Sequence, residues 1–513
     1  MKYPIGIQDF QKLQEGGYLY IDKTEVIHKL LTAGQYYFLS RPRRFGKSLL
    51  LSTIKYLFQG KKELFDGLWI GQHWNWKEQS PVIHLRFSSM DYQHLPLGEA
   101  ISNQLLEIAQ EHNIDLEGDS YKEQFRLLIR NLSTRGKVAL LIDEYDKPII
   151  DYLDKDLLPQ AKSNQGVLKT FYSVIKDSDP YIRFLMVTGV SKFSKVSIFS
   201  ELNNLKDITL HRQYATLVGY TQDELEEVFD SRIEEISEEE NIDKQELLAR
   251  IKKWYNGYSW DGKNFLYNPF SALSYFDSGE FHNYWFATGT PTFLINLLKE
   301  RMVYKVEAIK VGMVAFDGFD PENIDTTSLL FQTGYLTIKA KEEFGVYLLD
   351  VPNQEVQDSL LQYLLGIFSY TSQVQATPLV LELRMAFLEN SLDRAMTIIN
   401  GLLKSIPSHI FLKDKEAYYH SVVFLVFQYL GLFIEAEVHT SDGRMDAVVQ
   451  TDSHIYILEF KLDESAESAL EQIREKKYAE KFHLQAKPII SIGINFSSET
   501  KSIEAWKTAK LFE

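Results

Sequence analysis

The sequence contains no cysteine and no apolar run long enough to cross a bilayer. Disulfide bonds and thiolate zinc sites are therefore excluded, and a reducing compartment is the simplest setting. Residues 1–10 lack the apolar core of a signal peptide. The longest apolar run, at 421–434, contains Gln428 and Tyr429 and is better interpreted as a buried helix leading towards a strand. We therefore expect a soluble, cytoplasmic protein with no membrane partner.

Positive charge is also scarce. The chain of 513 residues has a formal net charge of −16, with 45% hydrophobic and 25% charged residues. This composition is typical of a folded protein, and the length suggests roughly three domains. A protein with this negative charge is not expected to coat nucleic acid by bulk electrostatics. Any contact with nucleic acid must therefore be made by local basic patches.

Short apolar segments alternate with helical patterns in the first part of the chain. We predict strands at 36–40, 82–87, 138–142 and 182–187, separated by helices. This alternation predicts a doubly wound parallel α/β sheet.

The pattern becomes helical from Thr221, where Thr221 and Glu224 form a capping-box sequence. A helix followed by two short strands within 322–352 is the pattern of a winged-helix module, and 355–410 are predicted to be helical connectors. We therefore divide the chain into four segments: 1–220, 221–354, 355–410 and 411–513.

Residues 41–48 (RPRRFGKS) follow the first strand and open a helix. A phosphate-binding loop needs a strand, a tight loop, a lysine and a hydroxyl at a helix start, and here Gly46, Lys47 and Ser48 supply the closing half. Arg41 stands where the opening glycine is usual, and a basic loop before a helix is the plainer interpretation. Asp143 and Glu144, at the end of a later apolar strand, favour nucleotide binding, with Asp143 holding Mg²⁺ through water and Glu144 polarising the attacking water.

These residues also carry a resemblance. Residues 3 to about 210, with RPRRFGKS and with LIDEYDKP at 141–148, resemble the AAA-ATPase-like domain of a bacterial and archaeal family. The arginine-rich loop is that family's own form of the motif. The resemblance implies ATP and Mg²⁺ at Arg44, Gly46, Lys47, Ser48 and Asp143, with Thr188 sensing the γ-phosphate; a strand-end cap is the other interpretation of Thr188.

The C-terminal segment carries carboxylates on apolar strands, where a chain that only needs to fold avoids them. A helix at 416–428, strands at 433–438, 444–450 and 455–461, a helix at 465–482 and a strand at 488–494 give the order α-β-β-β-α-β. Asp446 falls on the second of these strands, and Glu459 and Lys461 fall on the third. A divalent metal and a phosphodiester between these side chains would explain the arrangement.

This order, over roughly 411–500, resembles the PD-(D/E)XK nuclease superfamily. The resemblance implies that Asp446 and Glu459 bind one or two Mg²⁺ ions, with Mn²⁺ as an alternative, and that Lys461 orients or activates the water. It adds Glu416 and Gln472 as further candidates. Singly, each residue has a plainer explanation, such as an ion pair of Asp446 with Arg444 or of Glu459 with Lys461.

Two functional hypotheses follow. One is an ATP-regulated or ATP-driven, metal-dependent nuclease that cuts DNA, in defence against foreign DNA or in DNA processing. The other is a nucleotide-controlled switch or scaffold whose C-terminal segment binds nucleic acid or a protein without cutting. AAA-like ATPases often take an arginine from a neighbouring subunit, which leaves room for a homo-oligomer. Aromatic residues at 254–260 and 284–286 are expected to pack in a core, although the former could stack on bases.

Overall fold

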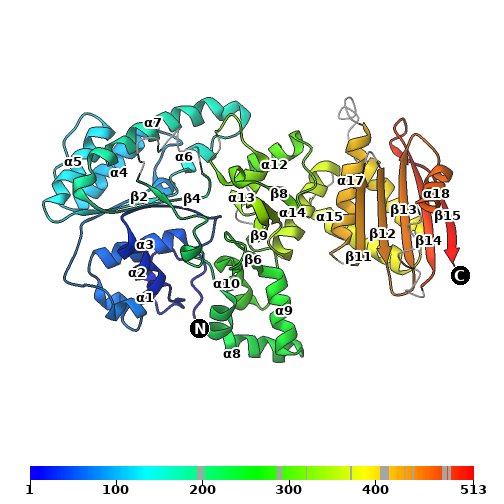
Figure 1. The fold of residues 1–513 in the computed structure, drawn as a ribbon, viewed down its shortest axis with the longest axis horizontal. Helices are drawn as coiled ribbons and strands as arrows, with labels where there is room; N and C mark the ends of the chain where they lie inside the picture. Colours follow the sequence, from blue (N-terminus) through cyan, green and yellow to red (C-terminus); the bar gives the residue numbers. More distant parts are fainter. Residues whose placement is uncertain are drawn as a thin grey trace. The chain divides into compact units, whose positions relative to one another are not determined.

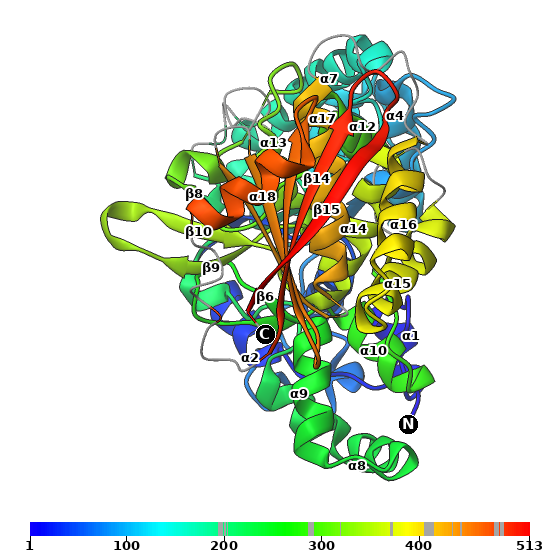
Figure 2. The same ribbon diagram turned by 90° about the vertical axis from the view of Figure 1, so that its right-hand side faces the viewer.

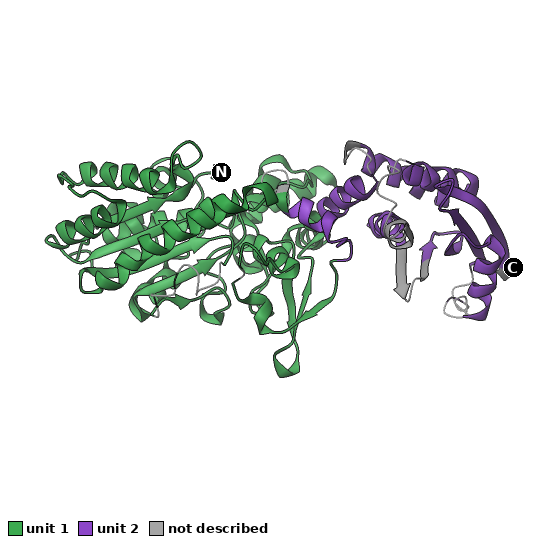
Figure 3. Ribbon diagram, turned by 90° about the horizontal axis from the view of Figure 1, so that it is seen from above, with its two compact units in different colours: residues 1–293, 306–356 green, residues 294–305, 357–513 purple. Residues whose placement is uncertain are grey.

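The computed structural model describes most of the chain (Figure 1). The described residues are 1–192, 199, 202, 204–285, 292–318, 320–369, 373–404, 415–432, 434–441, 444–476, 482 and 487–512. They form two compact units, one of residues 1–293 with 306–356 and the other of residues 294–305 with 357–513 (Figure 3). The finer division into four segments stays a prediction.

Unit 1 is built on a five-stranded sheet in which every strand pair is parallel, in the order β2-β3-β4-β1-β5. Its longer strands are mostly apolar because helices cover both faces, with α1 to α3 on one side and α4 to α7 on the other (Figure 1). This confirms the predicted doubly wound sheet; the short β5 and the long α7 were not predicted. The elements are α1 (Phe10–Glu15), α2 (Thr24–Ala33), β1 (Tyr36–Ser40), α3 (Lys47–Phe58), β2 (Val82–Arg86), α4 (Leu97–Glu111), α5 (Tyr121–Ser133), β3 (Val138–Asp143), α6 (Lys147–Ile150), α7 (Leu158–Asp177), β4 (Ile182–Gly189) and β5 (Lys206–Asp207).

The rest of unit 1 contains a helical part and a small antiparallel sheet. The predicted capping box is present: the Thr221 hydroxyl accepts from the Glu224 amide, and the Glu224 carboxylate accepts from the Thr221 amide. The sheet has the order β8-β10-β9, and α13 precedes β9 and β10 as expected of a winged-helix pattern. The elements are α8 (Gln222–Glu240), α9 (Lys244–Tyr255), β6 (Asn256–Tyr258), β7 (Leu266–Tyr267), α10 (Pro269–Ser278), α12 (Thr292–Glu300, whose residues from 294 belong to unit 2), β8 (Ile309–Val311), α13 (Thr326–Thr333), β9 (Thr337–Lys341) and β10 (Tyr347–Asp350).

Unit 2 is a second five-stranded sheet, ordered β11-β12-β13-β14-β15, with helices on both faces (Figure 2). The β13–β14 pair is parallel and the other pairs are antiparallel. The predicted α-β-β-β-α-β order is present, but the second helix ends at Glu475 and a further strand, β15, follows. The elements are α14 (Gln354–Ser369, whose residues up to 356 belong to unit 1), α15 (Gln373–Leu388), α16 (Leu392–Lys404), α17 (Lys415–Leu430), β11 (Glu435–Ser441), β12 (Arg444–Gln450), β13 (Ile455–Leu462), α18 (Ala466–Glu475), β14 (Ile489–Ser497) and β15 (Ser502–Phe512).

Strand β13 shows how the two faces of this sheet are used. Ile457 packs in a cluster with Ile473 of α18, whereas Phe460 packs against Phe427 of α17, with ring centroids 5.8 Å apart. Since side chains alternate along a strand, Glu459 shares the α18 face with Ile457. The helix that carries Glu416 therefore covers the face opposite to Glu459.

Within the part of the chain that the structure describes, no helix is both long and apolar enough to cross a membrane.

Candidate functional site

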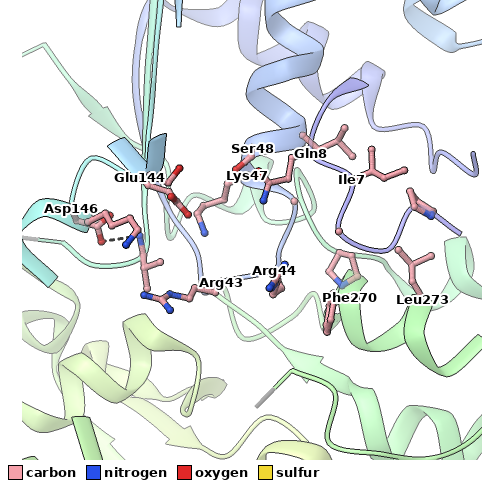
Figure 4. A pocket seen from close by; sticks show the side chains of 18 of the residues that line it. Ile7, Gln8, Arg43, Arg44, Lys47, Ser48, Glu144, Asp146, Phe270 and Leu273 are labelled. Carbon is pink, nitrogen blue, oxygen red and sulfur yellow. Dashed lines mark hydrogen bonds between the residues drawn. The ribbon is translucent and has the colours of Figure 1, made fainter. Parts of the chain in front are cut away.

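A cavity of about 460 Å³ lies at the carboxyl end of the parallel sheet in unit 1 (Figure 4). The loop after β1 forms one wall, and the residues that follow β3 and β4 form another. Ligands of open α/β sheets bind at this edge, because the loops that leave the strands converge there.

The loop between β1 and α3 has the geometry of a phosphate cradle. Gly46 adopts φ 85°, and the start of α3 has no side-chain cap, so the amides of its first turn are left for a ligand. A Cβ on Gly46 would meet no atom within 4 Å, but a side chain would be strained at this φ. The Lys47 ammonium donates to the carbonyls of Arg41 (2.8 Å) and Pro42 (2.9 Å), which holds it across the loop. The amides, the lysine and the adjacent Ser48 fit a nucleotide phosphate with its magnesium ion.

Arg41 does not line the cavity. Its side chain is fully buried, donates to the carbonyls of Ser40 and Thr209, and stacks at 3.9 Å on the ring of Trp260. Burial lowers the pKa of its guanidinium to about 9, against the raising influence of Asp207 and Asp261. The chain therefore accepts an arginine in place of the usual glycine because the side chain turns into the core, while its carbonyl still binds Lys47.

The acidic wall follows β3. The side chain of Asp143 is buried and accepts a hydrogen bond from the Thr188 hydroxyl at 2.6 Å. Neither of these residues lines the cavity, whereas Glu144, in a left-handed turn with φ 53°, does. Asp146, which the sequence analysis did not select, also lines it and accepts hydrogen bonds from the amides of Val190 (3.0 Å) and Ser191 (2.6 Å). Burial raises the pKa of Asp146 to about 6.

The far end of the cavity is apolar. Phe270 and Leu273 of α10 and Ile7 of the N-terminal segment lie there, and Arg44 stacks over the Phe270 ring at 4.9 Å (Figure 4). An apolar wall of this kind suits a flat aromatic ligand such as a nucleobase. The sequence analysis did not predict this wall, because only the fold brings residue 7 and residue 270 together.

Two aromatic segments support the cradle from behind. Tyr258 and Trp260 pack edge-on against the Phe45 ring, with centroids 4.9 and 5.2 Å away. The Trp285 indole donates to the Arg43 carbonyl (3.2 Å), and its amide donates to Glu355 (2.7 Å). The expected packing role holds for these described aromatics; residues 286–291 lie outside the described part.

In unit 2, strand register brings the predicted charged residues into one row. Asp446 of β12 is directly opposite Glu459 of β13. Directly opposed residues of antiparallel strands share a face, with Cβ atoms roughly 5 Å apart. That spacing suits two carboxylates that share a divalent ion. In the next strands the row continues at His439, opposite Asp446, and at Gly493, beside Glu459. His439 was not among the predicted residues.

The Glu459 carboxylate is fully buried and accepts a hydrogen bond from the Gln472 amide of α18. Lys461, two residues further on the same face, lies 3.5 Å from the Glu464 carboxylate with its side chain 14% exposed. Gly493 lets α18 approach, because a Cβ there would lie 2.2 Å from the Ala466 carbonyl. A glycine inside an otherwise apolar strand is a sequence signal for such an approach.

For Asp446 and Glu416 the structure describes the backbone alone, within β12 and α17. Among the side chains that are described, no group of three or more His, Asp or Glu residues is arranged to hold a metal ion. The predicted metal pair therefore stands on the register of β12 and β13 and on the buried Glu459.

Comparison with known proteins defines the class. Residues 4–199 match the family described as "Predicted AAA-ATPase", and residues 414–506 match the "PD-(D/E)XK nuclease superfamily". The protein thus combines an ATPase-like domain with a nuclease-superfamily domain, as the two resemblances implied. The chain belongs to the same family as the "Uncharacterized protein in vnfD 5'region" of Azotobacter chroococcum mcd 1, to which it is 39% identical over 522 residues, with 98% of each chain covered. No solved structure matches this chain.

Proposed function

We propose that this protein binds and hydrolyses ATP and uses its C-terminal domain as a metal-dependent DNA endonuclease, acting in defence against foreign DNA or in DNA processing. The absence of cysteine suits work in the reducing cytoplasm. The observation that carries the nuclease proposal is the register of Asp446 with the buried Glu459, because two carboxylates at one level of a sheet have little other reason to be kept there.

In the nucleotide site, Lys47 and the first-turn amides of α3 would bind the phosphates, and Ser48 would hold Mg²⁺. Asp143, which does not line the cavity itself, would hold the ion through water. Glu144 would orient the attacking water, and Arg44 would lie beside the base end of the cavity. The hydrogen bond between Thr188 and Asp143 supports a role for Thr188 in keeping Asp143 oriented next to the γ-phosphate. The contribution of Mg²⁺ would be to neutralise the charge of the phosphates.

In the nuclease site, Asp446 and Glu459 would hold Mg²⁺ or Mn²⁺, and Gln472 would fix the orientation of the Glu459 carboxylate. Lys461 would orient the attacking water and stabilise negative charge on the phosphodiester. A bound divalent ion supplies polarisation of the phosphate and a water of lowered pKa. Glu416 is proposed as an additional carboxylate from the resemblance alone, since its helix covers the face of the sheet opposite to Glu459.

A second candidate function is a nucleotide-controlled switch whose C-terminal domain binds nucleic acid or a protein without cutting. The net charge of −16 favours it, because such a charge weakens attraction to DNA. The two candidates differ in whether DNA is cut.

The test incubates the purified full chain with plasmid and linear DNA, with Mg²⁺ or Mn²⁺, with and without ATP. We expect metal-dependent cleavage that Asp446→Ala or Lys461→Ala abolishes. Cleavage that survives both substitutions would show that the assigned site is wrong. If neither DNA nor RNA is cut with either metal, the switch is the better account, and Lys47→Ala then shows whether nucleotide controls binding.

A further inference from the structure

Two neighbouring arginines of the phosphate loop line the cavity at different ends. Arg44 adopts φ 68° and stacks over Phe270 at the apolar end. The side chain of Arg43 extends instead towards the side on which Asp146 lies (Figure 4). The left-handed conformation at position 44 lets two consecutive side chains diverge in this way.

The end reached by Arg43 is the one suited to the terminal phosphate. Lys47 crosses the middle of the cradle, Phe270 marks the opposite, apolar end, and Glu144 lies on the acidic wall. Glu144 and Asp146 line the cavity on the side towards which Arg43 extends. Arg43 therefore belongs to the group of charges around the catalytic carboxylate that we propose, and not to the base end.

Two of the acids that follow β3 already accept hydrogen bonds. Asp143 accepts from Thr188, and Asp146 accepts from two backbone amides. Within the described residues, the Arg43 guanidinium has neither an ion pair nor a side-chain hydrogen bond. It lines the same cavity as the Lys47 ammonium, which carries the same charge. Two cations held together at one cavity are unfavourable until an anion binds between them.

The backbone of Arg43 is held from outside the loop. Its carbonyl accepts from the Trp285 indole at 3.2 Å and from the Asn268 amide at 3.5 Å. Trp285 is itself buried, and its backbone amide donates a hydrogen bond to the Glu355 carboxyl group. The position of Arg43 is thus built into unit 1 and is not that of a free surface side chain.

We infer that Arg43 contacts the terminal phosphate of ATP and supplies, within the same chain, the cation that AAA-like ATPases often take from a neighbouring subunit. The inference rests on the proposed binding of nucleotide. Trp285 is then a positioning residue that acts through the Arg43 carbonyl. Because ADP lacks the third phosphate, Arg43 distinguishes ATP from ADP.

The deciding experiment measures by calorimetry the affinity of the full chain for a non-hydrolysable ATP analogue and for ADP, both with Mg²⁺. For Arg43→Ala we expect the preference for the triphosphate to fall about 10- to 100-fold, with little change in ADP affinity, because a charge-assisted contact to one phosphate is lost. Arg44→Ala, in the same loop but at the apolar end, should weaken binding of the analogue and of ADP alike, so that the preference stays unchanged. Trp285→Phe, which removes the indole donor, should lower the preference for the triphosphate less than Arg43→Ala does. Arg43→Lys, which keeps the positive charge, should retain part of the preference that Arg43→Ala loses.

Failure of the inference and failure of the proposed function give different results. If the unaltered protein binds neither nucleotide, the proposed function is wrong. If it binds both equally, or if Arg43→Ala keeps the preference, the inference about Arg43 is wrong although nucleotide binding stands. Mixing Arg43→Ala with Lys47→Ala chains tests the same-chain part: ATP hydrolysis should stay at the level of the separate variants, and its recovery would mean that Arg43 acts on a neighbouring site.

Discussion

The two candidate sites of this protein are assembled in opposite ways. The cavity of unit 1 gathers residues from turns and helices far apart in the sequence, such as Ile7, Lys47, Glu144 and Phe270. The row in unit 2 needs only neighbouring strands, because Asp446 lies opposite Glu459. The strands that carry the row can be predicted from local sequence spacing, whereas a convergent site depends on tertiary packing.

The backbone differs between the two sites as well. In the cavity, Arg44 and Glu144 adopt left-handed conformations with φ 68° and 53°, which cost about 1–3 kcal/mol each in a non-glycine residue. Glu459 lies in regular strand and carries no such strain. We therefore expect the cavity to change shape on binding and the strand row to be preorganised.

The largest effect expected is on the strand row. Glu459→Gln keeps the shape of the side chain and the oxygen that accepts from Gln472, but removes the charge that a metal ion needs. DNA cleavage should fall about 1,000-fold or more, since charge stabilisation of the transition state is lost. Glu464→Gln, at the half-exposed partner of Lys461, is the control and should stay within about twofold of the unaltered rate. Equal losses in both variants would mean that the row is not the cutting site.

More of unit 2 than of the cavity could be predicted from the sequence, because strands are indicated by local patterns whereas the cavity depends on tertiary packing. The alternating apolar pattern placed Asp446 and Glu459 on two successive strands, which are β12 and β13. The register that sets these two residues opposite one another was not predicted. In the cavity, the loop at 41–48 was readable from its own residues, but the apolar wall and Asp146 were not, because they reach the site only through packing. Two features at the C-terminal end of the domain were not predicted: α18 is shorter than the predicted helix, and β15 follows β14. No charge pattern in the sequence indicated either of them.

The next effect concerns Glu355, which supports Trp285 in unit 1. Burial raises the pKa of its carboxyl to about 8, above the value of 4.5 in an unfolded chain. The unfolded state therefore releases its proton first, and stability falls as pH rises from about 4.5 to 8. Stability should fall by about 2 kcal/mol between pH 6 and pH 8, because the slope of about 1.4 kcal/mol per pH unit declines as the pH approaches the folded pKa. Glu355→Gln should remove this loss.

Asp146, with a pKa of about 6, adds a loss of stability of the same sign, most of it below pH 6. Denaturant unfolding of unit 1 at pH 6, 7 and 8 is the measurement. If the free energy of unfolding of the unaltered protein does not change between pH 6 and pH 8, Glu355 is not neutral in the folded state. The carboxyl group that holds Trp285 behind Arg43 is then charged.

A smaller effect tests the convergent site directly. Lys47→Ala removes the ammonium held by the carbonyls of Arg41 and Pro42, and ATP affinity should fall about 100-fold because a charge-assisted phosphate contact is lost. Lys62→Ala, at an exposed residue outside the cavity, is the control and should bind as the unaltered protein does. Calorimetric titration with ATP and Mg²⁺ measures both. If Lys47→Ala keeps its affinity for ATP, the loop between β1 and α3 does not bind the phosphates through Lys47.

The smallest expected effect tests whether the strand row is as rigid as its register implies. In Gly493→Ala the new Cβ would lie 2.2 Å from the Ala466 carbonyl and 2.9 Å from Leu470, so α18 must shift away from the sheet. Unit 2 should lose about 1–3 kcal/mol of stability in denaturant unfolding. Gly401→Ala, in α16, meets no atom within 4 Å and should instead gain about 0.5–1 kcal/mol from its better helix propensity. Because α18 carries the Gln472 amide that binds Glu459, the Gly493 variant should also cleave DNA more slowly. If its stability and its cleavage rate both equal those of the unaltered protein, α18 adapts to the added methyl group and the row is not preorganised.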